Sequence, residues 1–79
     1  MPHQPVLISW LDIVGNDNRP WLDLKEAEGF TPSSMQTVGY IVKDDPMFVT
    51  VVSTLGPDEV GNLNCIPRGC IQSIQPLTL

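Results

Sequence analysis

Two runs rich in β-branched residues, joined by a tight turn, constrain the fold of this chain more than any other feature. The first run covers residues 35–43 (MQTVGYIVK), and the second covers residues 47–55 (MFVTVVSTL). Between them stands Asp44-Asp45-Pro46, a sequence of turn-forming residues. β-branched and aromatic side chains favour strands, and a short gap between two such runs predicts a β-hairpin. We therefore expect an antiparallel hairpin at the centre of the fold.

Three further segments predict strands around this hairpin. Residues 6–14 (VLISWLDIV) form the first, residues 63–67 (LNCIP) a short fourth, and residues 71–77 (IQSIQPL) the last. Pro76 at the end of the last strand favours a position at the edge of a sheet, because proline cannot donate to a strand ladder. Residues 68–70 predict one tight turn of 3₁₀ type. The fold class is therefore mainly β, a five-stranded antiparallel small barrel.

One short helix is predicted in the first long loop, over residues 21–28 (WLDLKEAE). The turn-forming residues 15–18 (GNDN) end the first strand before it. Pro20 suits the first helical position and Gly29 suits the C-cap. Residues 30–34 (FTPSS) predict the loop that leads to the hairpin.

The two hairpin strands carry apolar side chains on both faces instead of alternating them with polar ones. Strands covered on both sides have this pattern. Charged residues make up only 16% of the chain, against about 25% in an ordinary domain. Both observations favour burial against another copy, so we expect a homo-oligomer. Gly39, inside the first run, predicts a bulge or a close approach by another backbone.

Length and charge exclude several classes of protein. The 79 residues suffice for a single small domain covering 1–79, and nine acidic residues against four basic ones give a net charge of −5. This sign disfavours binding to DNA, RNA or an anionic membrane. Residues 1–5 lack the basic start of a signal peptide, and the apolar run 6–14 is shorter than the ~20 residues of a membrane span. We expect a cytoplasmic protein.

The residues that carry most enzyme chemistry are scarce. His3 is the only histidine, which disfavours a catalytic pair, and a zinc site needs four ligands. Cys65 and Cys70 are expected to be buried reduced thiols, with a disulfide, a metal ligand or a nucleophile as alternatives. The acid pairs at 44–45 and 58–59 lie in predicted turns, where solvated carboxylates are usual. The sequence predicts no enzyme, no cofactor and no metal site.

Five residues could bind a nucleotide-like ligand, which needs an aromatic surface for stacking and positive or N–H-rich groups for phosphate. Trp21 lies at a loop-to-helix junction close to Arg19. Arg68 stands beside Gly69, where the backbone can approach a ligand closely. Tyr40 is a further aromatic candidate. These residues form the predicted ligand site.

Each of these candidates also has a structural interpretation. Trp21 could close one end of the barrel, and Arg68 could pair with Asp12 or a neighbouring acid. Tyr40, with apolar neighbours, suits the core as well as the surface. Trp10, on the first strand, is expected in the core.

The segment Ile66-Pro67-Arg68-Gly69-Cys70-Ile71 resembles the IP-x-x-x-[IV] segment of Src-homology-3-like barrels. The resemblance implies a 3₁₀ turn between the last two strands. It does not extend to the aromatic residues with which those domains bind proline-rich peptides, so polyproline recognition is not expected.

A broader pattern resembles small bacteriophage- and prophage-encoded proteins with Src-homology-3-like or Sm-like barrels. It comprises Trp10-x-Asp12, Pro20-Trp21, residues 37–42 (TVGYIV) and residues 66–71 (IPRGCI). The resemblance implies a phage accessory protein in the bacterial cytoplasm. Some small oligomeric phage barrels sequester the nucleotide signals of host defence.

Two functions are therefore expected. The first is a non-enzymatic homo-oligomer that sequesters a small nucleotide-type immune signal between its subunits. The alternative is an acidic interaction module that binds or blocks a host or phage protein, or a minor component of the virion or its assembly. The net charge of −5 suits the alternative, because it would steer a basic partner towards the chain.

Overall fold

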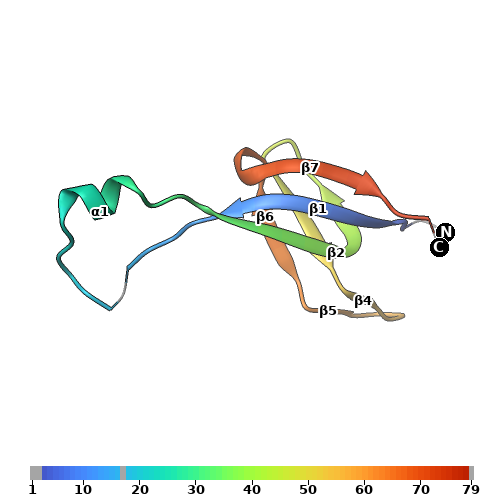
Figure 1. The fold of residues 1–79 in the computed structure, drawn as a ribbon. Helices are drawn as coiled ribbons and strands as arrows, with labels where there is room; N and C mark the ends of the chain where they lie inside the picture. Colours follow the sequence, from blue (N-terminus) through green and yellow to red (C-terminus); the bar gives the residue numbers. More distant parts are fainter. Residues whose placement is uncertain (1–2, 17, 79) are drawn as a thin grey trace.

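An antiparallel sheet of five strands forms the body of the molecule (Figure 1). The structure is a computed structural model that describes residues 3–16 and 18–78. Across the sheet the order is β6-β3-β2-β1-β7. The bounds of these strands are β1 Pro5–Asp12, β2 Ser33–Asp44, β3 Phe48–Val52, β6 Asn64–Pro67 and β7 Ile71–Pro76. The prediction of five antiparallel strands is confirmed. Among the described residues no ladder joins β6 to β7, so the predicted closure into a barrel is not confirmed.

The β2–β3 hairpin is confirmed, with its turn where the sequence predicts it. The Asp45 amide donates to the Phe48 carbonyl at 3.0 Å, and the Asp45 carboxylate accepts from the Met47 amide at 2.8 Å. A register shift between Ile41 and Lys43 bends β2 near the hairpin. The predicted 3₁₀ turn is also present, as η1 (Arg68–Cys70).

A second, two-stranded sheet interrupts the run that the sequence assigns to one strand. β4 (Thr54–Leu55) pairs with β5 (Val60–Gly61), where the sequence predicts only a turn. The Gly56 amide closes the connection by donating to the Glu59 carbonyl at 2.8 Å. Ser53 separates β3 from β4, and its amide donates to the Gly61 carbonyl at 3.0 Å.

The core lies against the inner face of the sheet and is small. Its buried apolar residues are contributed by β1, β3 and β6: Val6, Ile8, Val49, Val51 and Ile66. In β3, four consecutive residues, 49–52, are at most 9% exposed. Both faces of β3 are therefore covered within one chain. The apolar pattern of this strand does not require a second copy, contrary to the inference from the sequence.

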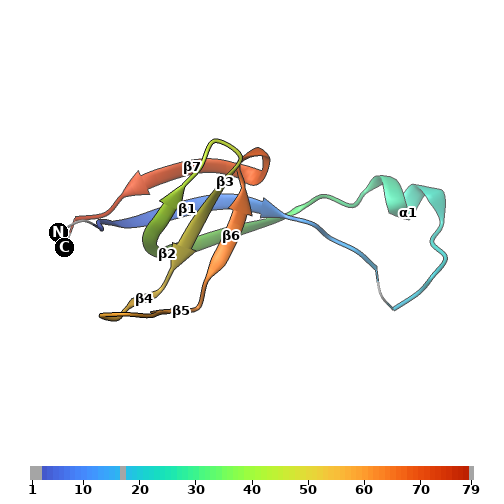
Figure 2. The same cartoon turned by 180° about the vertical axis from the view of Figure 1, so that it is seen from behind.

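Residues 13–32 are here called the arm, and the described residues of the arm, 13–16 and 18–32, project from the end of the sheet (Figures 1 and 2). The arm leaves where β1 and β2 pair through Asp12 and Ser33. The molecule measures 52 × 24 × 23 Å, and its radius of gyration is 16.0 Å. A compact domain of this length has a radius of gyration of about 12 Å. The chain is therefore markedly elongated, and the arm extends its long axis.

The arm contains the predicted helix, α1 (Leu24–Glu28), with Gly29 at its C-cap as expected. The helix begins three residues later than predicted because Asp23 has an extended backbone, with ψ at 140°. Asp17, part of the predicted turn before it, lies outside the described residues. No helix in the described ranges is long and apolar enough to cross a membrane.

Gly39 provides a test of the sheet packing. A methyl group there would overlap the carbonyl oxygen of Val52, so the predicted close approach of another backbone is confirmed. We expect Gly39→Ala to lower the free energy of unfolding by about 1–3 kcal/mol, because the overlap is with backbone rather than a flexible side chain. Gly69→Ala is the matched control, since its methyl group would meet no atom within 4 Å. The control should change the free energy of unfolding by less than about 0.5 kcal/mol. Urea unfolding measures both, and equal stabilities would contradict the described packing.

Candidate functional site

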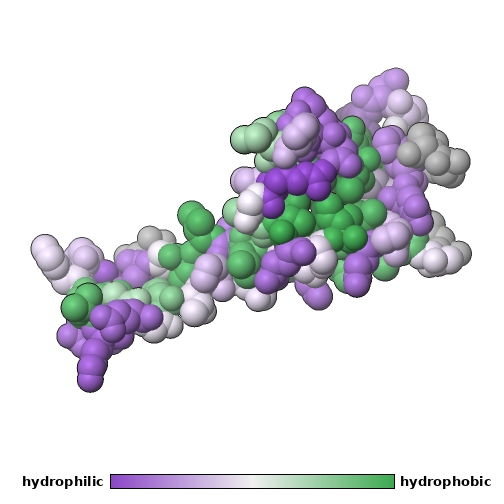
Figure 3. Space-filling model, turned by 90° about the horizontal axis from the view of Figure 1, so that it is seen from above, coloured by the Kyte–Doolittle hydropathy of each residue, from purple (hydrophilic) through white to green (hydrophobic). Residues whose placement is uncertain are grey.

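The arm exposes large apolar side chains that the sheet leaves uncovered. Ile13 is 90% exposed, Trp21 87% and Leu24 72%, and Phe30 is 47% exposed. None of the five residues of α1 is buried. Figure 3 shows hydrophobic side chains along the narrow arm as well as over the body. Single exposed apolar residues are ordinary, but a group on one projecting segment is typical of an interaction surface.

The arm is ordered by contacts within itself. The Arg19 guanidinium pairs with the Glu26 carboxylate at 2.7 Å, and the Asn16 side-chain amide donates to the Arg19 carbonyl at 3.3 Å. The Phe30 amide donates to the Ala27 carbonyl at 3.2 Å, which closes the end of α1. These contacts span the segment before and after Trp21. They hold its shape without covering its apolar side chains.

The predicted ligand residues lie in three parts of the molecule. Arg19 and Trp21 are on the arm, Arg68 and Gly69 are on η1, and Tyr40 is on β2. Tyr40 pairs with Pro5 and Val52, whereas the arm begins at the opposite end of the β1–β2 ladder. The chain brings Arg68 and Gly69 together as neighbours, but it does not gather the five residues around one cavity.

A shallow hollow of about 230 Å³ lies where the arm meets the sheet. Its lining consists of Leu11, Asp12, Ile13, Pro32, Gly69 and Cys70. Gly69 is the only one of the predicted ligand residues in that lining. The hollow presents one carboxylate and no cation, which does not suit a phosphate.

Both predicted phosphate-binding arginines have carboxylate partners. Arg19 pairs with Glu26, and Arg68 pairs with Asp44. Arg68 also donates from Nε to the Asp45 carbonyl at 3.2 Å, and its amide donates to the Met47 carbonyl at 2.9 Å. The prediction that Arg68 pairs with Asp12 or a neighbouring acid is therefore confirmed, and the acid is Asp44. Arg68 ties η1 to the β2–β3 turn.

The two tryptophans have opposite environments. Trp10 packs against the core, as expected, and its indole Nε1 donates to the Thr37 hydroxyl at 2.9 Å. Trp21 does not close an end of the sheet, because 87% of its surface is exposed. The structural interpretation of Trp21 is therefore wrong. Tyr40 is half-buried.

The structure shows the surroundings of both cysteines and of the histidine. Cys65 is exposed and Cys70 half-buried, and both are free thiols. The predicted burial of Cys65 is wrong because side chains alternate along β6, and the neighbouring Ile66 is the residue that points into the core. His3 Nδ1 lies 3.0 Å from the Ile41 carbonyl oxygen. Within residues 3–16 and 18–78, no group of three or more potential ligands could hold a metal ion.

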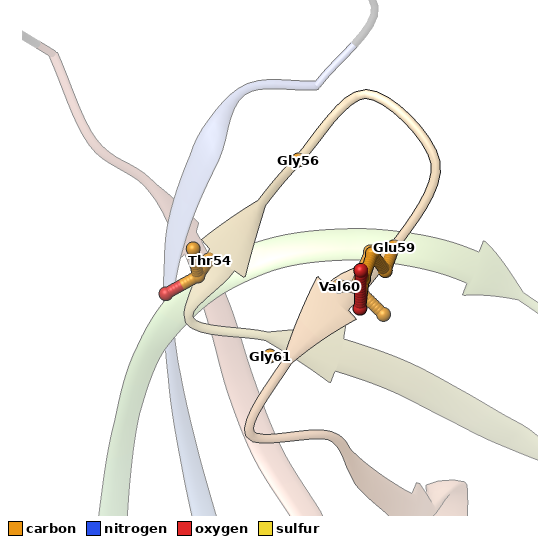
Figure 4. Close-up of a pocket in the computed structure, with 5 residues that line it drawn as sticks. All are labelled: Thr54, Gly56, Glu59, Val60 and Gly61. Atoms are coloured by element: carbon orange, nitrogen blue, oxygen red, sulfur yellow. The ribbon is translucent and has the colours of Figure 1, made fainter.

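A second hollow, of about 260 Å³, lies at the β4–β5 hairpin. Figure 4 shows its lining residues: Thr54, Gly56, Glu59, Val60 and Gly61. Thr54 comes from β4, and Glu59 precedes β5. One hydroxyl and one carboxylate on a hairpin of two two-residue strands give neither an activated nucleophile nor a cation-binding set.

Comparison with known proteins gives no relative. No family model, no curated protein and no solved structure matches the chain. The predicted relation to phage proteins and to Src-homology-3-like barrels therefore stays a prediction. The proposed function therefore rests on the geometry of the arm.

The arm is the feature that residue-type reasoning missed. The signal was the length of the segment between the first two strands, residues 13–32. Loops longer than about 12–15 residues are uncommon in compact domains and are often functional. So short a helix is normally stabilised by packing, but no residue of α1 is buried.

The two arginines provide a matched test of this description. Arg68→Met keeps the apolar stem but removes the contacts with Asp44 and Asp45, and should lower the free energy of unfolding by about 1 kcal/mol. Arg19→Met removes a pair whose side chains are 61% and 50% exposed. It should cost less than about 0.5 kcal/mol, because exposed pairs are screened by water. Thermal and urea unfolding measure both. A larger loss for Arg19→Met would contradict the assigned role of Arg68.

Proposed function

We propose that this protein is a non-enzymatic interaction module that binds another polypeptide chain through its arm. Trp21, 87% exposed on a segment that its own sheet does not cover, carries the proposal. Tryptophan is among the residues most enriched at the energetic centres of protein interfaces. Leu24 and Ile13, both at least 72% exposed, supply further apolar contacts around it.

The internal order of the arm supports this role. Binding costs free energy when loops and side chains must be fixed in place, and a preorganised segment reduces that cost. The Arg19–Glu26 pair joins the segment before Trp21 to α1, and backbone hydrogen bonds close the end of α1. These contacts favour the conformation of the arm in which its apolar side chains are exposed.

Sequestration of a small nucleotide signal stays a prediction. A site made of Arg19, Trp21, Arg68 and Gly69 would need a second chain to bring the arm of one copy to η1 of the other. Each arginine would then have to exchange a carboxylate partner for phosphate. Calorimetry against cyclic dinucleotides and ADP-ribose derivatives tests it, and an absence of heat would eliminate it.

The finer description of the fold and setting also belongs to the proposal. In a Src-homology-3-like barrel the arm would be the long loop between the first two strands. The strand order and the 3₁₀ turn before the last strand support that comparison. A cytoplasmic setting, in a bacterial host if the chain is phage-encoded, is part of the same proposal.

Photo-crosslinking at the arm tests the interaction module. We expect a benzoyl-phenylalanine in place of Trp21 to give covalent adducts with protein in cells that make the chain, because the arm lies within an interface. The same amino acid in place of Val60, 46% exposed on the β4–β5 hairpin, is the control. Mass spectrometry of the adducts identifies the crosslinked chain.

The comparison between the two positions decides the result. Protein adducts at position 21 in clear excess over position 60 support the proposal. Equal yields, or no protein adduct at position 21, would contradict it.

A further inference from the structure

We infer that the chain bound by the arm is a second copy of this protein, and that the arm lies along the outer face of β2, β1 and β7 of that copy. The inference rests on the proposed function and names its partner. The contact is reciprocal, with each arm on the sheet of the other copy. Such a pair has the two-fold symmetry that is commonest among protein dimers.

The exposed area of the chain is large enough for a stable dimer. Its accessible surface is 6120 Å². A compact monomer of 8.7 kDa exposes about 4,700 Å², so the excess is roughly 1,400 Å². An interface of standard size buries about 800 Å² per partner. The elongation of the chain therefore provides more surface than one such interface needs.

The arm also has the length of the strand that it would cover. The long axis of the molecule measures 52 Å and contains both β1 and the arm (Figure 1). β1 has eight residues and spans about 26 Å at ~3.3 Å per residue. An arm of this reach can lie along the whole of β1 in a second copy.

The register of the strands defines the outer face. Val6 and Ile8 are buried in the core, and Val6 pairs with the buried Gly39. Because side chains alternate along a strand, their neighbours point to the other side of the sheet. The outer face, as used here, consists of Leu7, Ser9, Gln36, Val38, Ser73 and Gln75. Val38, on β2 beside Leu7 of β1, is 59% exposed.

The distribution of charge favours this face over other parts of a second copy. The stretches 5–11, 33–42 and 71–76, which make up nearly all of β1, β2 and β7, contain no Asp, Glu, Lys or Arg. Seven of the thirteen charged residues lie in the segment from Asp12 to Glu28, with both ends included. The other six lie at positions 43–45, 58–59 and 68. The arm has four acids and two bases. Two chains of charge −5 repel each other, and this repulsion is least where the acidic arm meets an uncharged surface.

Sedimentation velocity of the purified full chain over a range of concentrations tests the inference. We expect a dimer of two 8.7 kDa chains. The arm variant Trp21→Ser with Leu24→Ser, and the face variant Val38→Glu, should each weaken dimerisation at least about tenfold. Leu63→Glu is the matched control, because Leu63 is 57% exposed but lies outside the outer face. The control should dimerise as the natural chain does.

Mixing the two variants distinguishes an arm-to-face contact from any other dimer. The face variant retains an intact arm, and the arm variant retains an intact outer face. Their mixture should therefore recover one of the two contacts and form a heterodimer at concentrations where each variant alone is mainly monomeric. Circular dichroism checks that both remain folded, which is expected because all three substituted side chains are at least 59% exposed.

Three results would overturn the inference. They are a natural chain that stays monomeric at every concentration, equal dimerisation of Val38→Glu and Leu63→Glu, and a mixture that gains no heterodimer. If the chain is monomeric and position 21 crosslinks to a different protein, the proposed interaction module is supported, but its partner is not a second copy. An absence of protein crosslinks at position 21 would remove both.

Discussion

The packing of Val49 and Val51 of β3 against Ile8 and Ile66 is the contact on which the rest of the structure depends. These four side chains are at most 2% exposed, and they join β3 to β1 and β6. β2 approaches β3 closely at Gly39, and both faces of β3 are covered within one chain. Burial of apolar surface is the main favourable term in folding. Here it is concentrated in the sheet, and α1 on the arm contributes no buried residue.

This concentration explains the division of the molecule into two chemically different parts. The strands carry almost no charge, and the charged residues lie in the arm, in the turns and at the strand ends. Arg68 uses its charge within the body, where it joins η1 to the β2–β3 turn, and Arg19 uses its charge within the arm. Two surfaces therefore remain exposed. One consists of the apolar side chains on the arm, and the other is the uncharged outer face of the sheet. An assembly that joins the arm to the outer face buries the apolar side chains of the arm. It does not place the acidic residues of the arm against other acidic residues.

The sequence predicts the parts of the fold in which local signals and packing agree. The turn at Asp44-Asp45-Pro46 is correct because turn-forming residues stand between two β-rich runs. The hairpin of β4 and β5 is missed because Val60 and Gly61 form a strand of only two residues. Two-sided burial of β3 is correctly predicted, but the sequence assigns it to a second copy, whereas the curvature and close packing of one sheet produce it.

The site residues are harder to predict for a physical reason. Trp21, Arg19 and Arg68 were selected by residue type, yet each arginine has a carboxylate partner that no sequence spacing specifies. The exposure of Trp21 is a tertiary property: an amphipathic segment next to a β-rich body is ordinarily expected to pack against it. The length of the segment 13–32 was the only local indication that it does not.

The central claim is that the arm leaves its own sheet uncovered and is covered by a second chain. Acrylamide quenching of Trp21 fluorescence over a dilution series tests it most directly, in a Trp10→Phe variant that removes the other tryptophan. The account predicts strong quenching at the lowest concentrations, because 87% of Trp21 is exposed in the single chain, and progressive protection as the concentration rises. Protection of Trp21 at every concentration, down to those at which the chain is monomeric, would show that the arm packs on its own sheet and would contradict the account.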